Sequence, residues 1–331
     1  MKLSILDQSP ISSIQTAQDA LIESMKLAQL GEALGYTRYW IAEHHDLPGL
    51  ACSAPEVMLS FIGAHTNHIR IGAGAVLLPH YKPYKVAEVF NMLSTLFPNR
   101  IDIGIGRSPG GSAEATNALN DNFLQKVYQI PQLVEELLHF LHQDFPTVHE
   151  FSKISAIPIP EATPLPWMLG TSEKSALLAA QNGLAYAFGQ FMSEEDGTQI
   201  LAAYRESFQP KNNGQTPQVL ITVPIICAET TEKAEEIALS SLIWQLLIDK
   251  GKGQTIPSIE EAKQYNLSEK ETDKLSNIKK KMIIGNPKEI KDSFLQLQSK
   301  YKVDEIMILT ITHSPEDRAN SYKLIAEEVL S

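Results

Sequence analysis

Four consecutive titratable residues, Glu43-His44-His45-Asp46, follow a strand-like run at residues 38–42. In parallel α/β folds the carboxyl ends of strands face the ligand crevice, so a polar cluster at this point indicates a functional site. Histidine suits a proton-transfer step, because its ordinary pKa of about 6.5 lets it gain or lose a proton near neutral pH. An ordinary surface loop would have the same composition, and that alternative stays open here.

The alternation of side chains along a strand separates the four residues. His44 shares a face with Trp40 and Ala42, whereas Glu43 and His45 share the opposite face. We therefore expect His44 to enter the site, and Glu43 and His45 to support it or to pack nearby. Because adjacent histidines point to opposite faces, they could not easily hold one ion, and the sequence predicts no metal centre.

Two later segments could bind a phosphate group. Arg107 follows a strand-like run at residues 101–106 and precedes further glycines, and a guanidinium group can donate two parallel hydrogen bonds to phosphate oxygens. Thr171, Ser172 and Ser175 stand where another strand passes into a helix, whose first N–H groups attract anions. A tight turn with an exposed arginine and an ordinary helix N-cap would explain the same residues.

The third strand-like run, at residues 69–78, contains very small residues, among them Gly72, Gly74 and Ala75. Small side chains leave space for a flat ligand to lie against the backbone. A close contact with a helix would need the same residues, so this segment alone does not decide between the two.

Strand-like and helical runs alternate along the chain. The strand-like runs are at residues 3–7, 38–42, 69–78, 101–106, 167–170, 184–188, 218–227 and 305–310, and the helical ones include 15–34, 55–66, 83–96, 121–142, 171–181 and 231–248. Eight strands alternating with helices predict an α/β fold, a (β/α)8 TIM barrel formed by a single domain over residues 1–331. A doubly wound open sheet is the alternative.

Two segments interrupt this alternation and are predicted as insertions in the barrel. Residues 144–166 contain five prolines, which a regular helix does not accept, and we expect a crossover along the surface. Residues 250–281 are rich in Lys and Glu and are predicted either as a lid over the site or as a solvated helical hairpin.

Composition excludes several classes of protein. The 331 residues are 43% hydrophobic and 20% charged, which is typical of a soluble globular protein. A net charge of −11 argues against binding to nucleic acid or to an anionic membrane. No apolar run reaches the roughly 18 to 20 residues of a membrane-spanning helix. The chain has only two cysteines, Cys52 and Cys227, and no signal peptide, so we expect a cytoplasmic protein.

Taken together, these motifs resemble the luciferase-like flavin monooxygenase family, to which the α subunit of bacterial luciferase belongs. The fold of that family is the (β/α)8 barrel. The resemblance rests on the joint occurrence of several motifs at their separations: Glu43-His44-His45, the end of the third strand at 72–79, Ala87-Glu88 with Asn91, Asn99-Arg100 followed by 104–107, and Gly285-Asn286-Pro287.

The resemblance implies that reduced flavin mononucleotide (FMN) binds at the barrel mouth. Its phosphate would be held by Arg107 and by the turn that contains Thr171, Ser172 and Ser175, although the family often has glutamate at the position of Thr171. Its ring would rest on a cis peptide bond between Gly74 and Ala75.

The resemblance also implies an activity: a flavin-dependent monooxygenase that oxidises a small organic substrate with O2, with His44 as the catalytic residue. Nothing in the chain resembles a nicotinamide site, so a separate flavin reductase is expected, and the family suggests a homodimer. One alternative is an oxidoreductase that transfers hydride to or from a deazaflavin coenzyme. Others are a non-catalytic flavin-binding protein and a metal-dependent barrel hydrolase.

Overall fold

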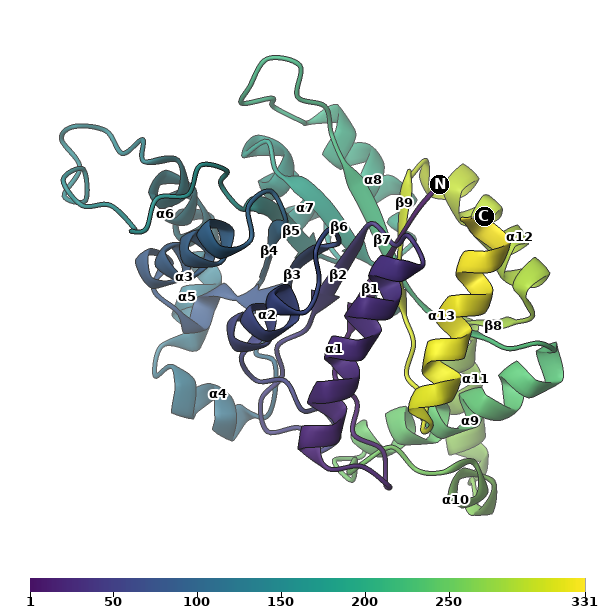
Figure 1. The fold of residues 1–331 in the computed structure, drawn as a ribbon. Helices are drawn as coiled ribbons and strands as arrows, with labels where there is room; N and C mark the ends of the chain where they lie inside the picture. Colours follow the sequence, from purple (N-terminus) through teal and green to yellow (C-terminus); the bar gives the residue numbers. More distant parts are fainter. Residues whose placement is uncertain (331) are drawn as a thin grey trace.

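The computed structural model describes residues 1–330 and contains a closed barrel of eight parallel strands (Figure 1). Strand β1 pairs with β2 and β9, and β7 pairs with β6 and β9, which closes the sheet. The short strand β8 pairs with β7 at the edge of the barrel. The strands are β1 (Lys2–Asp7), β2 (Arg38–Ile41), β3 (Arg70–Leu77), β4 (Ile101–Gly106), β5 (Leu165–Gly170), β6 (Ala185–Gly189), β7 (Val219–Cys227), β8 (Ile283–Gly285) and β9 (Glu305–Leu309).

Helices surround the barrel (Figure 1), and the predicted (β/α)8 architecture is confirmed. Within residues 1–330, no helix is long and apolar enough to cross a membrane. The α-helices are α1 (Ala17–Ala33), α2 (Pro55–Ala64), α3 (Pro83–Leu96), α4 (Ala113–Leu119), α5 (Phe123–Tyr128), α6 (Ile130–His142), α7 (Glu173–Gln181), α8 (Gly197–Glu206), α9 (Thr231–Ile248), α10 (Ile259–Gln264), α11 (Glu269–Lys280), α12 (Pro287–Tyr301) and α13 (Pro315–Val329); the 3-10 helices are η1 (Leu78–His80) and η2 (Gln190–Met192).

The prediction of one helix over residues 121–142 is wrong. The chain forms two helices there, α5 and α6, and α6 begins at Ile130 with Pro131 in its first turn. Proline has no backbone N–H and clashes with the preceding turn, so it is accepted at the start of a helix but not in its interior. The second helix therefore has to start at this proline.

The amino end of the barrel interior is filled by charged side chains. Arg38 of β2 donates hydrogen bonds to Glu305 of β9 and to Asp102 of β4, each at 2.6 Å, and Arg70 of β3 donates to Asp102 at 2.5 Å. Above them lies an apolar layer that includes Trp40. Because these two layers fill the lower part of the barrel, open space remains at the carboxyl ends of the strands.

The two insertions lie at opposite ends of the barrel. The crossover between α6 and β5 projects from the side where the strands begin (Figure 1), and the Asn91 amide of α3 donates to the Ala156 carbonyl within it at 2.7 Å. Residues 250–281 form α10 and α11, which pack against α9. The backbone of Ile256 pairs with Ile11 and Ser13, in the loop that follows β1. This second insertion therefore lies beside the strand ends that carry the predicted site.

Candidate active site

Two cavities meet at the carboxyl ends of the strands. The barrel cavity, of about 600 Å³, is lined mainly by residues at the ends of β2 to β6. The outer cavity, of about 790 Å³, lies between the strand ends and helices α9 and α11. Five residues line both cavities and form what we call the shared wall: Gln8, His44, Leu47, Phe191 and Met192.

Small residues give the barrel cavity its shape. A side chain on Gly106 would place its Cβ 2.9 Å from the Ala75 Cβ, and one on Gly189 would place its Cβ 3.0 Å from the Met192 Cε. The Gly106 contact is too close for ordinary packing, whereas at Gly189 the end of the Met192 side chain could move aside, so Gly106 is the position that needs a glycine. The Gly74–Ala75 peptide bond is cis, as the resemblance led us to expect. The cavity has room for a flat ring system resting on backbone.

One end of the barrel cavity is suited to an anion. Arg107 and Thr171 line it, and the Arg107 guanidinium donates to the hydroxyl of Ser172 at 3.2 Å. Ser172 is the N-cap of α7, so free N–H groups of the first helical turn lie next to the arginine. The structure thus brings Arg107, Thr171 and Ser172 together, and their donors match the needs of a phosphate group.

Ser175 has a different position from the other three predicted phosphate ligands. It is buried, and its hydroxyl donates to the Ser172 carbonyl at 2.7 Å and lies 2.9 Å from the hydroxyl of Tyr186. It stands behind the helix start rather than on the cavity surface. The capping interpretation explains Ser175, which holds the turn that presents Thr171 and Ser172.

His44 belongs to the shared wall and is half-buried. Burial, with a smaller contribution from the neighbouring His45, lowers the pKa of His44 to about 4. Its Nδ1 atom is buried and has no hydrogen-bond partner. The expectation that this imidazole titrates near neutral pH is therefore wrong: it is neutral at pH 7 and can accept a proton when negative charge or a proton donor arrives beside it.

Glu43 and His44 both line the barrel cavity, but only the side chain of Glu43 has hydrogen-bond partners in neighbouring segments. The Glu43 carboxylate is hydrogen-bonded to the His45 ring at 2.9 Å, and it accepts from the Tyr81 hydroxyl at 2.6 Å and from the Leu77 N–H at 3.0 Å. Burial, and then this carboxylate, raise the pKa of Tyr81. Glu43 thus ties the end of β2 to the end of β3. Within residues 1–330, no three His, Cys, Asp or Glu side chains form a group that could hold a metal.

Sequence reasoning missed several residues that line the cavities. Gln8 directly follows β1, so the strand-end argument that found His44 could also have found it. Phe191 and Met192 follow β6, but as apolar residues they carry no chemical signal. Trp244 of α9 and Lys281, which follows α11, line the outer cavity only because those helices fold back over the strand ends.

The fold and the site together define a barrel with a cavity at the carboxyl ends of its strands, donors suited to an anion at one end of that cavity and a histidine on its wall. The family model for luciferase-like monooxygenase matches residues 1–301. The chain belongs to the luciferase-like monooxygenase family and is an oxidoreductase, so the resemblance seen in the motifs is confirmed.

Relatives match over nearly the whole chain. The uncharacterized protein YceB of Bacillus subtilis (strain 168) is 43% identical, with 98% of each chain covered. The N-acetyl-S-alkylcysteine monooxygenase of the same organism is 35% identical, with 100% of this chain and 99% of the relative covered. Both matches thus extend over nearly the whole of the two chains compared.

Solved structures share the fold. The structure of apo-MsnO8 superposes with a TM-score of 0.87 at 30% identity, with 99% of this chain and 98% of that chain covered. More distant structures show the fold alone. They include the oxygenating constituent of 3,6-diketocamphane monooxygenase in complex with FMN (TM-score 0.72, 17% identity, 99% and 97% covered). Another is an F420-dependent secondary alcohol dehydrogenase, which superposes with a TM-score of 0.66 at 12% identity, with 99% of this chain and 98% of that chain covered. The barrel is thus shared by enzymes of both cofactor types.

The low pKa of His44 predicts a pH-dependent stability. An imidazole in the unfolded chain binds a proton at about pH 6.5, whereas folded His44 resists it until about pH 4. Acid therefore favours the unfolded state, and the free energy of unfolding should fall by on the order of 3 kcal/mol between these pH values through this group alone. Urea unfolding of the wild type and of His44→Gln from pH 7.5 to 4 measures the difference.

The variant His142→Gln, which removes an exposed histidine at the end of α6, is the matched control and should follow the wild type. If His44→Gln loses stability on acidification as steeply as the wild type, His44 is not the buried neutral group described above.

Proposed function

We propose that the protein is a flavin-dependent monooxygenase that uses reduced FMN and O2 to oxidise a small organic substrate. One atom of O2 enters the substrate, the other leaves as water, and the two electrons come from reduced FMN, which a separate reductase supplies. The observation that carries the proposal is the position of His44. It lies on the wall shared by a cavity with an anion-binding end and a second, larger cavity.

The barrel cavity fits FMN in shape and in charge. Its glycine-lined walls leave space for a flat ring, and Arg107, Thr171 and Ser172 offer donors for the phosphate. FMN bound there would supply the oxygen chemistry that the side chains lack. A deazaflavin coenzyme would fit a similar space in the same fold. Two relatives, of 35% and 32% identity, are named as monooxygenases, which favours the cofactor that reacts with O2.

The protein's own residues have two tasks in this proposal. The apolar part of the shared wall, Leu47, Phe191 and Met192, keeps water away from the ring once both cavities are filled. His44, which is neutral before reaction, accepts a proton when charge develops beside it and returns it later. Glu43 positions the strand ends on which these groups lie.

The named relative suggests a first substrate to test. N-acetyl-S-alkylcysteine monooxygenase is 35% identical over the full chain. We therefore propose thioethers of this type as candidate substrates, in which the sulfur would receive the oxygen atom.

Both cysteines of this chain are buried and unpaired, which supports the proposed cytoplasmic location, where reduced flavin and thiols coexist.

Removing the charge of Arg107 should weaken FMN binding selectively. In Arg107→Met the dissociation constant for FMN should rise by about 10-fold, because a charge-assisted hydrogen bond to phosphate is lost. Riboflavin, which has the same ring without the phosphate, should bind the variant and the wild type equally. Titration followed by flavin fluorescence measures both. An equal loss of affinity for the two ligands would show that Arg107 does not contact the phosphate.

Replacing His44 should separate binding from turnover. His44→Ala should bind FMN as the wild type does, but form oxygenated product at least about 100-fold more slowly, because the proton acceptor is missing. Product from an N-acetyl-S-alkylcysteine is measured by chromatography with chemically reduced FMN, while an oxygen electrode and a peroxide assay follow O2. The variant His45→Gln is the control and should lose far less. Full product formation by His44→Ala would refute the assigned role.

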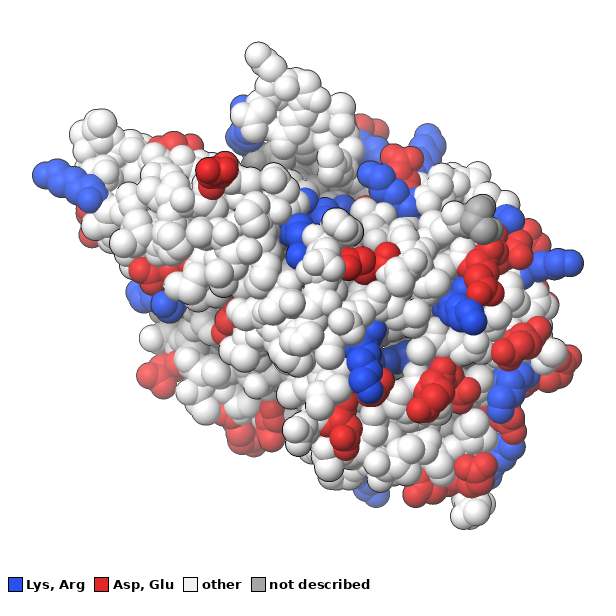
Figure 2. Space-filling model, in the orientation of Figure 1, with Lys and Arg blue, Asp and Glu red and all other residues white. Residues whose placement is uncertain are grey.

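We also propose a homodimer formed through α2 and α3. Val57 and Phe61 are four residues apart on α2, Met92 and Leu96 four apart on α3, and all four are exposed. Figure 2 shows few charged side chains where these two helices lie in Figure 1. Exposed apolar side chains on two helices that contact each other, as α2 and α3 do, are typical of a contact between subunits.

The substitutions Phe61→Asp and Met92→Asp test this contact. Together they should convert the dimer to monomers in light scattering, because each would bury an unpaired carboxylate. Leu124→Asp, which changes an exposed residue of α5, is the control and should leave the mass unchanged. A monomeric wild type, or a dimer that survives both changes, would contradict the assignment.

A further inference from the structure

The outer cavity combines apolar walls with a surplus of positive charge. Most of its lining is apolar, including Leu47, Leu50, Trp244, Ile248, Ile278 and Ile311. Its charged lining consists of three lysines, at positions 274, 280 and 281, and two acids, Glu194 and Asp249. This excess of cations stands out in a chain whose net charge is −11. A ligand that complements the cavity would carry an apolar body and one negative charge.

The three lysines differ in how firmly they are paired. Lys274 lies 2.9 Å from the Asp249 carboxylate inside the cavity, so that pair is neutral as a whole. Lys280 is exposed and donates only to the Asn277 amide oxygen, at 3.3 Å. Lys281 is half-buried and lies 2.8 Å from Glu194, whose side chain is 89% exposed.

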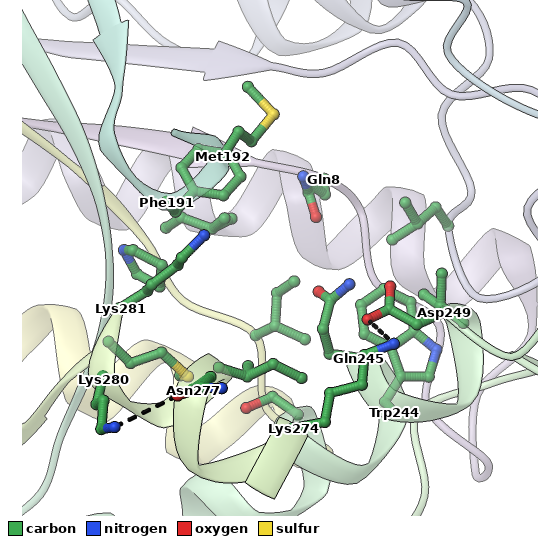
Figure 3. A pocket seen from close by; sticks show the side chains of 18 of the residues that line it. Gln8, Phe191, Met192, Trp244, Gln245, Asp249, Lys274, Asn277, Lys280 and Lys281 are labelled. Atoms are coloured by element: carbon green, nitrogen blue, oxygen red, sulfur yellow. Dashed lines mark hydrogen bonds and ion pairs between the residues drawn. The ribbon is translucent and has the colours of Figure 1, made fainter. Parts of the chain in front are cut away.

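An ion pair with so exposed a partner contributes little, because water solvates the carboxylate almost as well as the lysine does. Lys281 can therefore exchange Glu194 for another anion at small cost. Its ammonium group points toward Phe191 and Met192 of the shared wall (Figure 3). Lys281 is thus a weakly paired, half-buried lysine aimed at the boundary between the two cavities, whereas Lys280, which has no acidic partner, is exposed.

Uncharged polar groups complete the cavity. Gln8 of the shared wall and Gln245 of α9 face each other across the space (Figure 3). Their amides can donate to and accept from a ligand, but they bring no charge of their own. Discrimination between charged and neutral ligands therefore falls to the lysines, of which Lys281 is the half-buried one that points to the shared wall.

We propose that the substrate of this enzyme is a small carboxylic acid with an apolar body, and that Lys281 binds its carboxylate. The inference rests on the proposed oxygenase function and specifies the substrate class of that site. Glu194 competes with the substrate: it occupies Lys281 when the cavity is empty and swings into solvent when a carboxylate arrives. The apolar body then lies along Leu47 and Trp244.

Binding to the flavin-free protein tests the proposal. The probes are octanoate and octanamide, which have the same length but differ in charge at pH 7.5, and calorimetry gives both dissociation constants. Octanoate should bind the wild type about 3- to 10-fold more tightly than octanamide, as expected for a partly exposed charge pair. Lys281→Ala should abolish this preference, and Lys281→Arg should keep most of it.

Two further variants separate substrate binding from a structural role of Lys281. Lys279→Ala removes a neighbouring lysine that pairs with Glu235 and does not line the cavity, so the preference should remain. Glu194→Gln removes the competing anion and should tighten octanoate binding by about 2- to 5-fold, but only while Lys281 is present. A lysine that merely holds the fold would give no such gain.

The proposal is overturned if octanoate and octanamide bind equally, if neither binds, or if Lys281→Ala keeps the preference. None of these measurements uses flavin or O2. Their failure would thus refute the substrate class and leave the oxygenase function to the FMN and turnover experiments. Failure of those experiments would in turn leave a carboxylate-binding cavity without the proposed chemistry.

Discussion

The buried ion pairs at the amino end of the barrel are the constraint on which the site depends. Arg38 joins Glu305 and Asp102 between β2, β9 and β4, and its guanidinium lies 4.7 Å from the ring of Trp167 on β5. Removing charges from water is costly, so each member must keep its partners, and breaking such a pair typically costs about 3 to 5 kcal/mol. Together with the Arg70–Asp102 pair, the network thereby links the starts of four strands, β2, β3, β4 and β9, at this end of the barrel.

The register of the strands determines where every inward-facing side chain lies, because the period of a strand is two residues. Along β2 and the residues after it, position 38 reaches the ion network, 40 the apolar layer and 44 the cavity wall. On β3, Arg70 reaches the network and Gly72 leaves room for Trp40, whose Nε1 would lie 2.8 Å from an added Cβ. Gly74 then opens the cavity. The barrel interior therefore has three layers: the ion network at the amino end, the apolar layer above it, and the cavity at the carboxyl end.

Features that depend on neighbouring residues are the ones that the sequence predicts well. The eight barrel strands follow from the order of strand-like and helical runs, and the place of His44 at the end of β2 follows from its position after a strand-like run. Both signals lie in neighbouring residues. The low pKa of His44 depends on how completely other segments bury it. The position of Ser175 behind the turn depends on Tyr186 of a neighbouring strand, and that of Lys281 on a helix pair folding back over β7 and β1. Such contacts between distant segments have no local signature.

The shared wall couples the two cavities through the solvation of one imidazole. Burial already holds His44 neutral with both cavities open to water, and a ligand in either one removes more of that water. Filling the cavities thus lowers its proton affinity further, until a negative charge develops next to it and reverses the balance. In the proposed mechanism, His44 therefore takes up a proton only when both ligands are in place and reaction has begun. Desolvation thus makes His44 a poor base in the empty protein. In the proposed mechanism it also restricts proton uptake by His44 to the protein with both cavities filled.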